Sequence, residues 1–214
     1  MHNEEKKSGI GQMLAEAGIL FAITLLSGIL LGYVYELTKE PIRVQKENAI
    51  QEACRQVLPE AAQAGAEFRI IDYTPTEAQE RQLAQNGVRI GTVYEAVAGD
   101  GSVTGYVVES TSSQGYGGKI VLYVGVSSDG QIGGVSVLEI SETAGLGMEA
   151  PNVLMPQFAG RMAQNFTYTK SGSTSEAEVD AISGATITTK AVVNAVNGAV
   201  MTAQQWMQGG GTNE

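Results

Sequence analysis

Near its amino terminus the chain carries an uninterrupted apolar segment. Residues 17–34 (AGILFAITLLSGILLGYV) contain no charged side chain, and Glu16 and Glu36 stand close to the two ends. At about 1.5 Å per residue, a helix of this length nearly spans the roughly 30 Å hydrocarbon layer of a bilayer. The pattern therefore predicts a single transmembrane helix over residues 17–35.

A cleaved signal peptide is the alternative explanation for this segment. No small-x-small cleavage site precedes Tyr35, and the apolar run is long for the core of a signal peptide. We therefore expect the segment to remain as a membrane anchor. Lys6 and Lys7 precede it and three basic residues follow within residues 36–46, so the distribution of positive charge does not fix its orientation.

The stretch after the apolar segment has helical and extended patterns in turn. Apolar residues recur near helical spacing over 42–58, and Pro59 is expected to stop that helix. A short strand is expected over 68–73 and a short helix over 76–85. Residues 36–88 are thus interpreted as a helical connector and the start of a soluble domain.

Between residues 91 and 140 the pattern favours β-structure. Runs rich in Val, Tyr and Ile are separated by Gly99-Asp-Gly101 and Ser128-Asp-Gly130, which are good hairpin turns. Hairpins join neighbouring antiparallel strands, so the pattern predicts an α+β domain and not a doubly wound parallel sheet. Four strands are expected, at about 91–98, 103–111, 119–127 and 132–140.

The last part of the chain should return to helix. A helix is expected over 153–162, a polar surface loop over 171–176, and a final helix that starts near Thr186 or Thr188 and packs one apolar face on the sheet. The expected organisation is a short tail at 1–16, the membrane helix at 17–35, the connector at 36–88, the main domain at 89–207 and a disordered tail at 208–214.

Composition narrows the chemistry that the chain can perform. The single histidine is His2 and the single cysteine is Cys54, so the chain cannot assemble a zinc, iron–sulfur or histidine-ligated haem site. Any redox cofactor would have to be organic. The formal net charge of −10 argues against a nucleic-acid partner, which requires clustered Lys and Arg.

The most informative motif is Asp180-Ala-Ile-Ser183-Gly184-Ala185-Thr186, at the change from an extended segment to the final helix. A tight glycine turn followed by a hydroxyl at a helix start suits an anion, because the first N–H groups of a helix lack partners. A phosphate-bearing cofactor fits this arrangement. The alternative is an ordinary Ser/Thr helix cap preceded by a turn.

Two glycine-rich loops accompany this motif. One is Glu142-Thr143-Ala-Gly145-Leu146-Gly147 after the last predicted strand, and the other is Gly115-Tyr116-Gly117-Gly118-Lys119 before the third. Glycines allow a backbone to approach a ligand closely, and they also serve in simple chain turns. Tyr116 could stack on a flavin, or it could be an ordinary half-exposed tyrosine at a strand end. Lys119 could balance a phosphate charge, or it could be a solvated surface lysine.

The run Asp-x-x-Ser-Gly-Ala-Thr resembles the flavinylation sequence of two related subunits. These are the G subunit of Rnf-type ferredoxin:NAD oxidoreductases and the C subunit of sodium-pumping NADH:quinone reductases. All the segments occur in the order expected for the Rnf G subunit, and the match covers nearly the whole chain. Because the chain lacks the longer N-terminal portion of the extracytoplasmic domain in the C subunit, the Rnf branch fits better. One departure is Ala144, where relatives often have proline.

The resemblance implies FMN joined through its phosphate to Thr186, with Thr188 and Thr189 as fallback hydroxyls. Since no histidine lies nearby to act as a base, self-attachment is implausible and a separate FMN transferase acting on FAD is implied. Asp180 and Ser183 would then serve recognition or positioning, and no catalytic residue is assigned. The other implied cofactor contacts are Gly184, Ala185, Glu142, Thr143, Gly145, Leu146, Gly147, Tyr116 and Lys119.

The resemblance also implies a setting and a role. The fold expected is α+β, with one transmembrane helix followed by an extracytoplasmic FMN-binding domain whose antiparallel sheet is packed by helices, in the cell (inner) membrane. The role implied is an electron-transfer subunit of an ion-translocating ferredoxin:NAD oxidoreductase, with other subunits of the complex as partners. A stand-alone membrane-anchored flavoprotein reductase and a cofactor-free membrane-anchored scaffold are the alternatives.

Overall fold

The computed structural model describes the backbone of residues 4–209 and the side chains of residues 11–209. Residues 1–3 and 210–214, which include parts of the two predicted tails, lie outside the described residues. The chain divides into two compact units, one up to residue 49 and one from residue 50 onward, and each is considered by itself.

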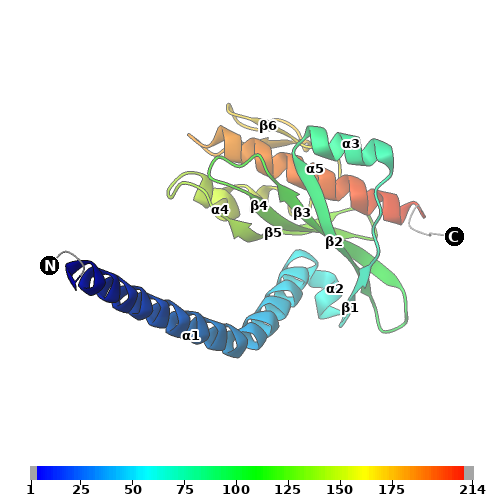
Figure 1. Ribbon diagram of the computed structural model, residues 1–214. Helices are drawn as coiled ribbons and strands as arrows, with labels where there is room; N and C mark the ends of the chain where they lie inside the picture. Colours follow the sequence, from blue (N-terminus) through cyan, green and yellow to red (C-terminus); the bar gives the residue numbers. More distant parts are fainter. Residues whose placement is uncertain (1–3, 210–214) are drawn as a thin grey trace. The chain divides into compact units, whose positions relative to one another are not determined.

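A single helix, α1 (Glu4–Val57), replaces the separate tail, membrane helix and connector helix expected from the sequence (Figure 1). Pro41 lies inside it, so one missing N–H did not end the helix. An 18-residue window of α1 reaches a mean hydropathy of 2.2, long and apolar enough to cross a membrane. All side chains of residues 11–49 are exposed. Together with its composition, this fits a membrane anchor.

The second unit contains a five-stranded antiparallel sheet in the order β1-β2-β3-β4-β5. The four strands expected from the hairpin pattern are present, and the short predicted strand before them joins as an edge. The α+β class is therefore confirmed. The strands are β1 (Glu67–Ile71), β2 (Val88–Val97), β3 (Val103–Ser112), β4 (Ile120–Ser127) and β5 (Ile132–Ile140).

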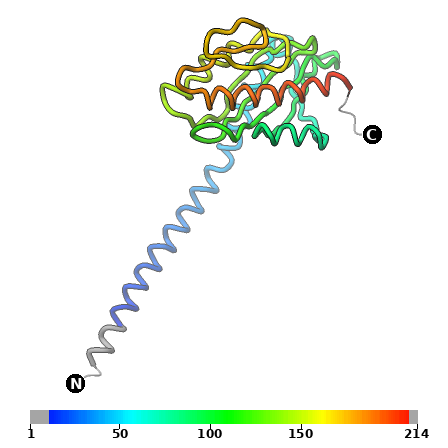
Figure 2. The backbone as a smooth tube through the Cα atoms, turned by 90° about the horizontal axis from the view of Figure 1, so that it is seen from above, coloured from blue at the N-terminus to red at the C-terminus, as the bar shows by residue number. Residues whose placement is uncertain are grey.

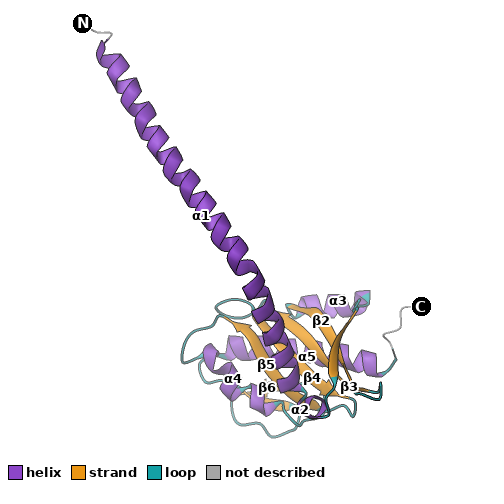
Figure 3. Ribbon diagram, turned by 90° about the horizontal axis from the view of Figure 1, so that it is seen from below, coloured by secondary structure: helices purple, strands orange, loops and turns teal. Residues whose placement is uncertain are grey.

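Helices cover both faces of this sheet, as Figures 1 and 3 show. The final helix α5 (Thr186–Met207) covers one face, and the last turns of α1 with α2 (Pro59–Gln63) cover the other. Strand β4 is therefore buried on both sides: Leu122 and Val124 belong to the α5 core, while Tyr123 belongs to the cluster under α1. Helix α3 (Glu77–Gln85) lies alongside α5 (Figure 2), where Leu83 contacts Gly198.

The segment between β5 and α5 differs most from expectation. The helix expected over 153–162 is wrong: the chain forms short turns, namely η1 (Gly147–Glu149), α4 (Ala150–Val153) and η2 (Met155–Gln157). Pro156 interrupts the expected helix because it lacks the N–H that a helix interior requires. The polar stretch 171–176 is a loop, as expected, and it joins two short parallel strands that the sequence did not reveal, β6 (Thr167–Thr169) and β7 (Glu178–Asp180).

Glycines on the sheet let the end of α1 approach unusually closely. A Cβ placed on Gly125 of β4 would lie 2.2 Å from the Val57 carbonyl oxygen, and one on Gly133 of β5 would lie 2.4 Å from the same atom. Only a glycine surface allows such backbone contact. The sequence showed these glycines within strand patterns without indicating what approaches them.

Cys54 lies in this contact and is fully buried. Burial raises the pKa of its thiol to about 12, so at pH 8 only about one thiol in ten thousand is the reactive thiolate. We expect Ellman's reagent to leave the native protein unmodified and to titrate one thiol per chain in denaturant. Rapid reaction of the native protein at pH 8 would contradict this packing of α1.

Candidate cofactor site

The start of α5 presents its first hydroxyl to a cavity. Thr186 is the first helical residue, and the preceding Ala185 supplies no side-chain cap. Thr189 holds the segment that leads into the helix: its Oγ1 donates to the Ala185 carbonyl at 2.9 Å and accepts from the Ile182 N–H at 3.1 Å. Gly184 turns the chain with a φ of +77°, a left-handed conformation that favours glycine. The first N–H groups of α5 thus remain available to an anion.

The three threonines at this helix start have different surroundings. Thr189 is fully buried and held by the two hydrogen bonds above. Thr188 is 1% exposed and donates to Glu142. Thr186 is half-buried and lines the cavity. Of the three hydroxyls, Thr186 is therefore the one free of structural hydrogen bonds among the described residues.

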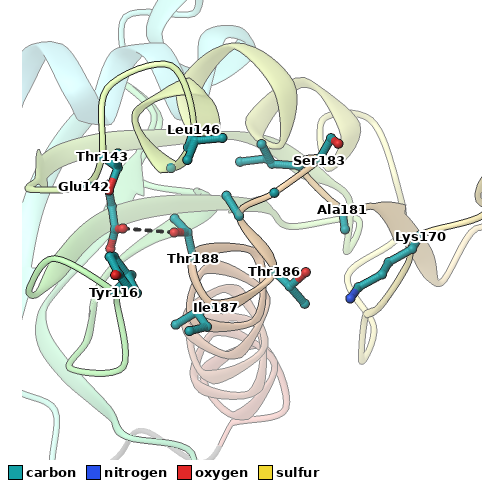
Figure 4. A pocket seen from close by; sticks show the side chains of 14 residues that line it. Tyr116, Glu142, Thr143, Leu146, Lys170, Ala181, Ser183, Thr186, Ile187 and Thr188 are labelled. Atoms are coloured by element: carbon teal, nitrogen blue, oxygen red, sulfur yellow. Dashed lines mark hydrogen bonds between the residues drawn. The ribbon is translucent and has the colours of Figure 1, made fainter.

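Glu142 joins the three motif segments. Its Oε2 accepts from Thr188 Oγ1 at 3.0 Å (Figure 4), and its Oε1 accepts from the Gly117 N–H at 3.3 Å. Gly147 packs against this pair without a side chain: a Cβ there would lie 2.6 Å from Thr188 Oγ1 and 2.9 Å from Glu142 Oε2. The loops after β3 and β5 are thus tied to the first turn of α5.

Replacing Gly147 with alanine should break this junction. Because the new methyl group overlaps the Glu142 and Thr188 side chains, we expect the free energy of unfolding to fall by about 1–3 kcal/mol, as for overpacking elsewhere. Denaturant unfolding followed through Trp206, the single tryptophan, measures this change.

Gly99→Ala is the matched control, since nothing lies within 4 Å of a Cβ at that turn. Equal stability of the two variants would show that Gly147 is not confined by Glu142 and Thr188.

The cavity has a volume of about 690 Å³, within the range of small-molecule sites. Figure 4 shows its walls, which come from the loop before β4, the loop after β5, the residue after β6, the segment between β7 and α5, and the first turn of α5. Its lining residues are Tyr116, Glu142, Thr143, Leu146, Gly147, Lys170, Ala181, Ile182, Ser183, Gly184, Ala185, Thr186, Ile187 and Thr188.

Most residues of the sequence hypothesis lie on this cavity, and three do not. Gly145 and Asp180 are outside its lining, and Lys119 forms an ion pair with Glu139 at 2.9 Å. Asp180 holds the neighbouring loop: its backbone N–H donates to Gln157 at 2.7 Å and its carboxylate accepts from the Ser173 N–H. The cofactor roles of all these residues stay predictions.

Lys170 is a lining residue that the sequence did not single out. It lies sixteen positions before Thr186 and follows β6 directly. Parallel pairing of β6 with β7 sets Thr169 opposite Asp180, so the next residue, Lys170, reaches the start of the motif loop. Strands of three residues leave almost no pattern in a sequence, which is why this proximity could not be predicted.

The part of the chain that forms this cavity matches a known protein family. The family described as the FMN-binding domain matches residues 115–201. This range begins at the Gly-Tyr-Gly-Gly loop and ends within α5, so it contains the three motif segments. The fold and the site thus define a flavoprotein domain of the FMN-binding class, preceded in the chain by an apolar helix.

Two relatives are similar over most of the chain. The G subunit of the Na⁺-translocating ferredoxin:NAD⁺ oxidoreductase complex of Acetobacterium woodii is 32% identical over 180 residues, covering 80% of this chain and 82% of that protein. The G subunit of the proton-translocating ferredoxin:NAD⁺ oxidoreductase complex of Clostridium ljungdahlii is 33% identical over 179 residues, covering 80% and 84%. The chain belongs to the family of G subunits of Rnf-type ion-translocating oxidoreductase complexes.

The crystal structure of Shewanella oneidensis NqrC is also similar, with a TM-score of 0.45 and 25% identity, over 55% of this chain and 61% of that one.

The residues of the cavity fit FMN. An uncapped helix start and Lys170 suit its phosphate, and the volume admits a three-ring ligand. Leu146, which is 39% exposed, and Ile187, which is 53% exposed, offer apolar surface for a flat ring system. A flavin needs both an anion site and an apolar wall, and this cavity supplies the two together.

Proposed function

We propose that this chain is an electron-transfer subunit of a membrane-bound ion-translocating ferredoxin:NAD oxidoreductase, with FMN attached through its phosphate to Thr186. The observation that carries the attachment is the difference among the three hydroxyls at the start of α5. Thr186 and Thr188 both line the cavity, but the hydroxyls of Thr188 and Thr189 are engaged in buried hydrogen bonds, whereas that of Thr186 makes none among the described residues. The relatives named as G subunits of such complexes support the wider role.

Attachment in this proposal needs a separate enzyme. A phosphoester bond forms between Thr186 Oγ1 and the FMN phosphorus, the pyrophosphate bond of FAD breaks, AMP leaves, and the hydroxyl proton passes to a base of the transferase. The residues lining the cavity include no histidine, and the carboxylate of Glu142 is occupied by Thr188 and Gly117. The residues that line the cavity in the described structure therefore offer no free general base for the step.

The residues of the chain would then hold and shape the site. The bound flavin supplies transfer of one or two electrons. The N–H groups of the first turn of α5 bind the phosphate, and Glu142 keeps the loops together around the cavity. Leu146 and Ile187 restrict water at the cavity wall. Covalent attachment keeps the cofactor on a domain that, in this proposal, lies outside the cytoplasm.

The direct test is purification of the protein from membranes of its native host in mild detergent. We expect yellow protein whose intact mass exceeds that of the polypeptide by FMN less one water, together with copurifying subunits of an oxidoreductase. Unmodified, colourless protein would refute the flavin assignment. Flavin-bearing protein without partners at all stages of purification would favour a stand-alone reductase.

A further inference from the structure

The charged side chains on the cavity wall are few and separated. Among the lining residues, Glu142 is the single acidic residue and Lys170 is the single positively charged residue. Figure 4 places them on opposite sides, with Thr188 next to Glu142 and Thr186 next to Lys170. The cavity therefore has an acidic side and a basic side, and Thr186 is on the basic side.

The two charges differ in how they are balanced. Glu142 already accepts two hydrogen bonds from Thr188 and Gly117. For Lys170, no carboxylate of the described residues lies within ion-pair distance, and its ammonium extends toward Thr186 in Figure 4. The other candidate lysine, Lys119, is neutralised by Glu139. In a chain with a net charge of −10, a cation left without an acidic partner beside a cavity is a specific feature.

The backbone holds Lys170 at this place. Thr169 pairs with Asp180 in the parallel β6–β7 ladder, and the Ala181 N–H donates to the Thr169 carbonyl at 2.8 Å. The segment that carries the cation is thus hydrogen-bonded to the segment that leads into Ser183. Lys170 is therefore held near the start of α5, although the two are far apart in sequence.

We infer that Lys170 is the counter-ion of the phosphodiester on Thr186 and a positioning residue for the bound flavin. This inference rests on the proposed function. A phosphodiester keeps one negative charge, and an ammonium beside it adds a full positive charge that the neutral helix N–H groups do not provide. With its phosphate held from two sides, the flavin has less freedom to swing about the Thr186 side chain.

The first test measures the accessibility of the lysine itself. Wild-type protein is prepared with and without coexpressed FMN transferase, and the rate of acetylation by acetic anhydride is read for each lysine by mass spectrometry of chymotryptic peptides. We expect acetylation of Lys170 to be severalfold slower in the flavinylated protein and to recover partly at high salt. Lys46, which is exposed on α1 and belongs to the other compact unit, serves as the internal control and should react equally in both.

The second test measures the order of the flavin. In Lys170→Met, FMN attached to Thr186 should show lower fluorescence anisotropy than in wild type, Lys170→Arg should restore it, and Lys46→Met should have no effect. If Lys170→Met acquires no flavin, the acetylation rates of Lys170 in the wild-type protein decide whether the counter-ion inference holds.

The outcomes separate the two proposals. Wild-type protein that gains no flavin from the transferase refutes the proposed function. Flavin on Thr186 together with unchanged Lys170 acetylation refutes the counter-ion inference alone, and so does Lys170→Met with wild-type anisotropy.

Discussion

Thr186→Ala is expected to abolish covalently bound FMN completely while leaving the fold intact. The variant removes the one hydroxyl in the first turn of α5 that makes no hydrogen bond among the described residues, and the hydroxyls of Thr188 and Thr189 are buried in hydrogen bonds. Alanine is well tolerated inside a helix, and Thr186 is half-buried and makes no structural hydrogen bond in the described structure. Flavin fluorescence in a denaturing gel and the intact mass measure the loss, after coexpression with the transferase.

Two variants control this experiment. Thr186→Ser keeps a hydroxyl at the same place and should retain some covalent flavin. Thr188→Val removes a nearby hydroxyl and the hydrogen bond to Glu142, and it should still carry FMN on Thr186. Covalent flavin in denatured Thr186→Ala protein would show that another side chain is the attachment site.

Gly125→Ala is expected to cause a large loss of stability in the second unit. Its new Cβ would lie 2.2 Å from the Val57 carbonyl oxygen and 2.6 Å from the carbonyl carbon, and both are backbone atoms of the last turn of α1. Backbone cannot rotate away as a side chain can, so the end of α1 must shift from the sheet. We expect a loss of about 3 kcal/mol or more in the free energy of unfolding, at the upper end of overpacking effects.

A second readout locates the effect of Gly125→Ala. Cys54 is buried in the same contact, so displacement of the helix end should make the thiol react with Ellman's reagent in otherwise folded protein. Gly99→Ala, whose Cβ meets open space, should leave both stability and thiol reactivity unchanged. Wild-type stability and an unreactive Cys54 in Gly125→Ala would show that α1 does not pack on the glycines as described.

Much of the fold could be predicted because the local pattern and the tertiary environment agree. The hairpin turns at residues 99–101 and 128–130 fixed the strand order, and the apolar face of α5 predicted its place on the sheet. The helix expected over 153–162 is wrong because Pro156 lacks the N–H that a helix interior requires. The length of α1 was missed because helix propensity continued on both sides of the apolar segment.

Some residues of the candidate site could be predicted from the sequence, and others could not. Thr186, Gly184 and Glu142 were found because they belong to continuous motifs, and the structure brings all three to one cavity. Lys170 was missed because two strands of three residues create its proximity. The position of Lys119 in a motif loop predicts a cofactor contact, and only the structure reveals its partner Glu139 on the neighbouring strand.

The most direct test of the central claim is to locate the modification on the flavinylated protein. Trypsin should release residues 171–190 as one peptide, since no Lys or Arg occurs between Lys170 and Lys190. Fragmentation of this peptide is expected to place the mass of FMN less one water on Thr186, with Thr188 and Thr189 unmodified. FMN on any other residue, or an unmodified peptide from yellow protein, would contradict the account.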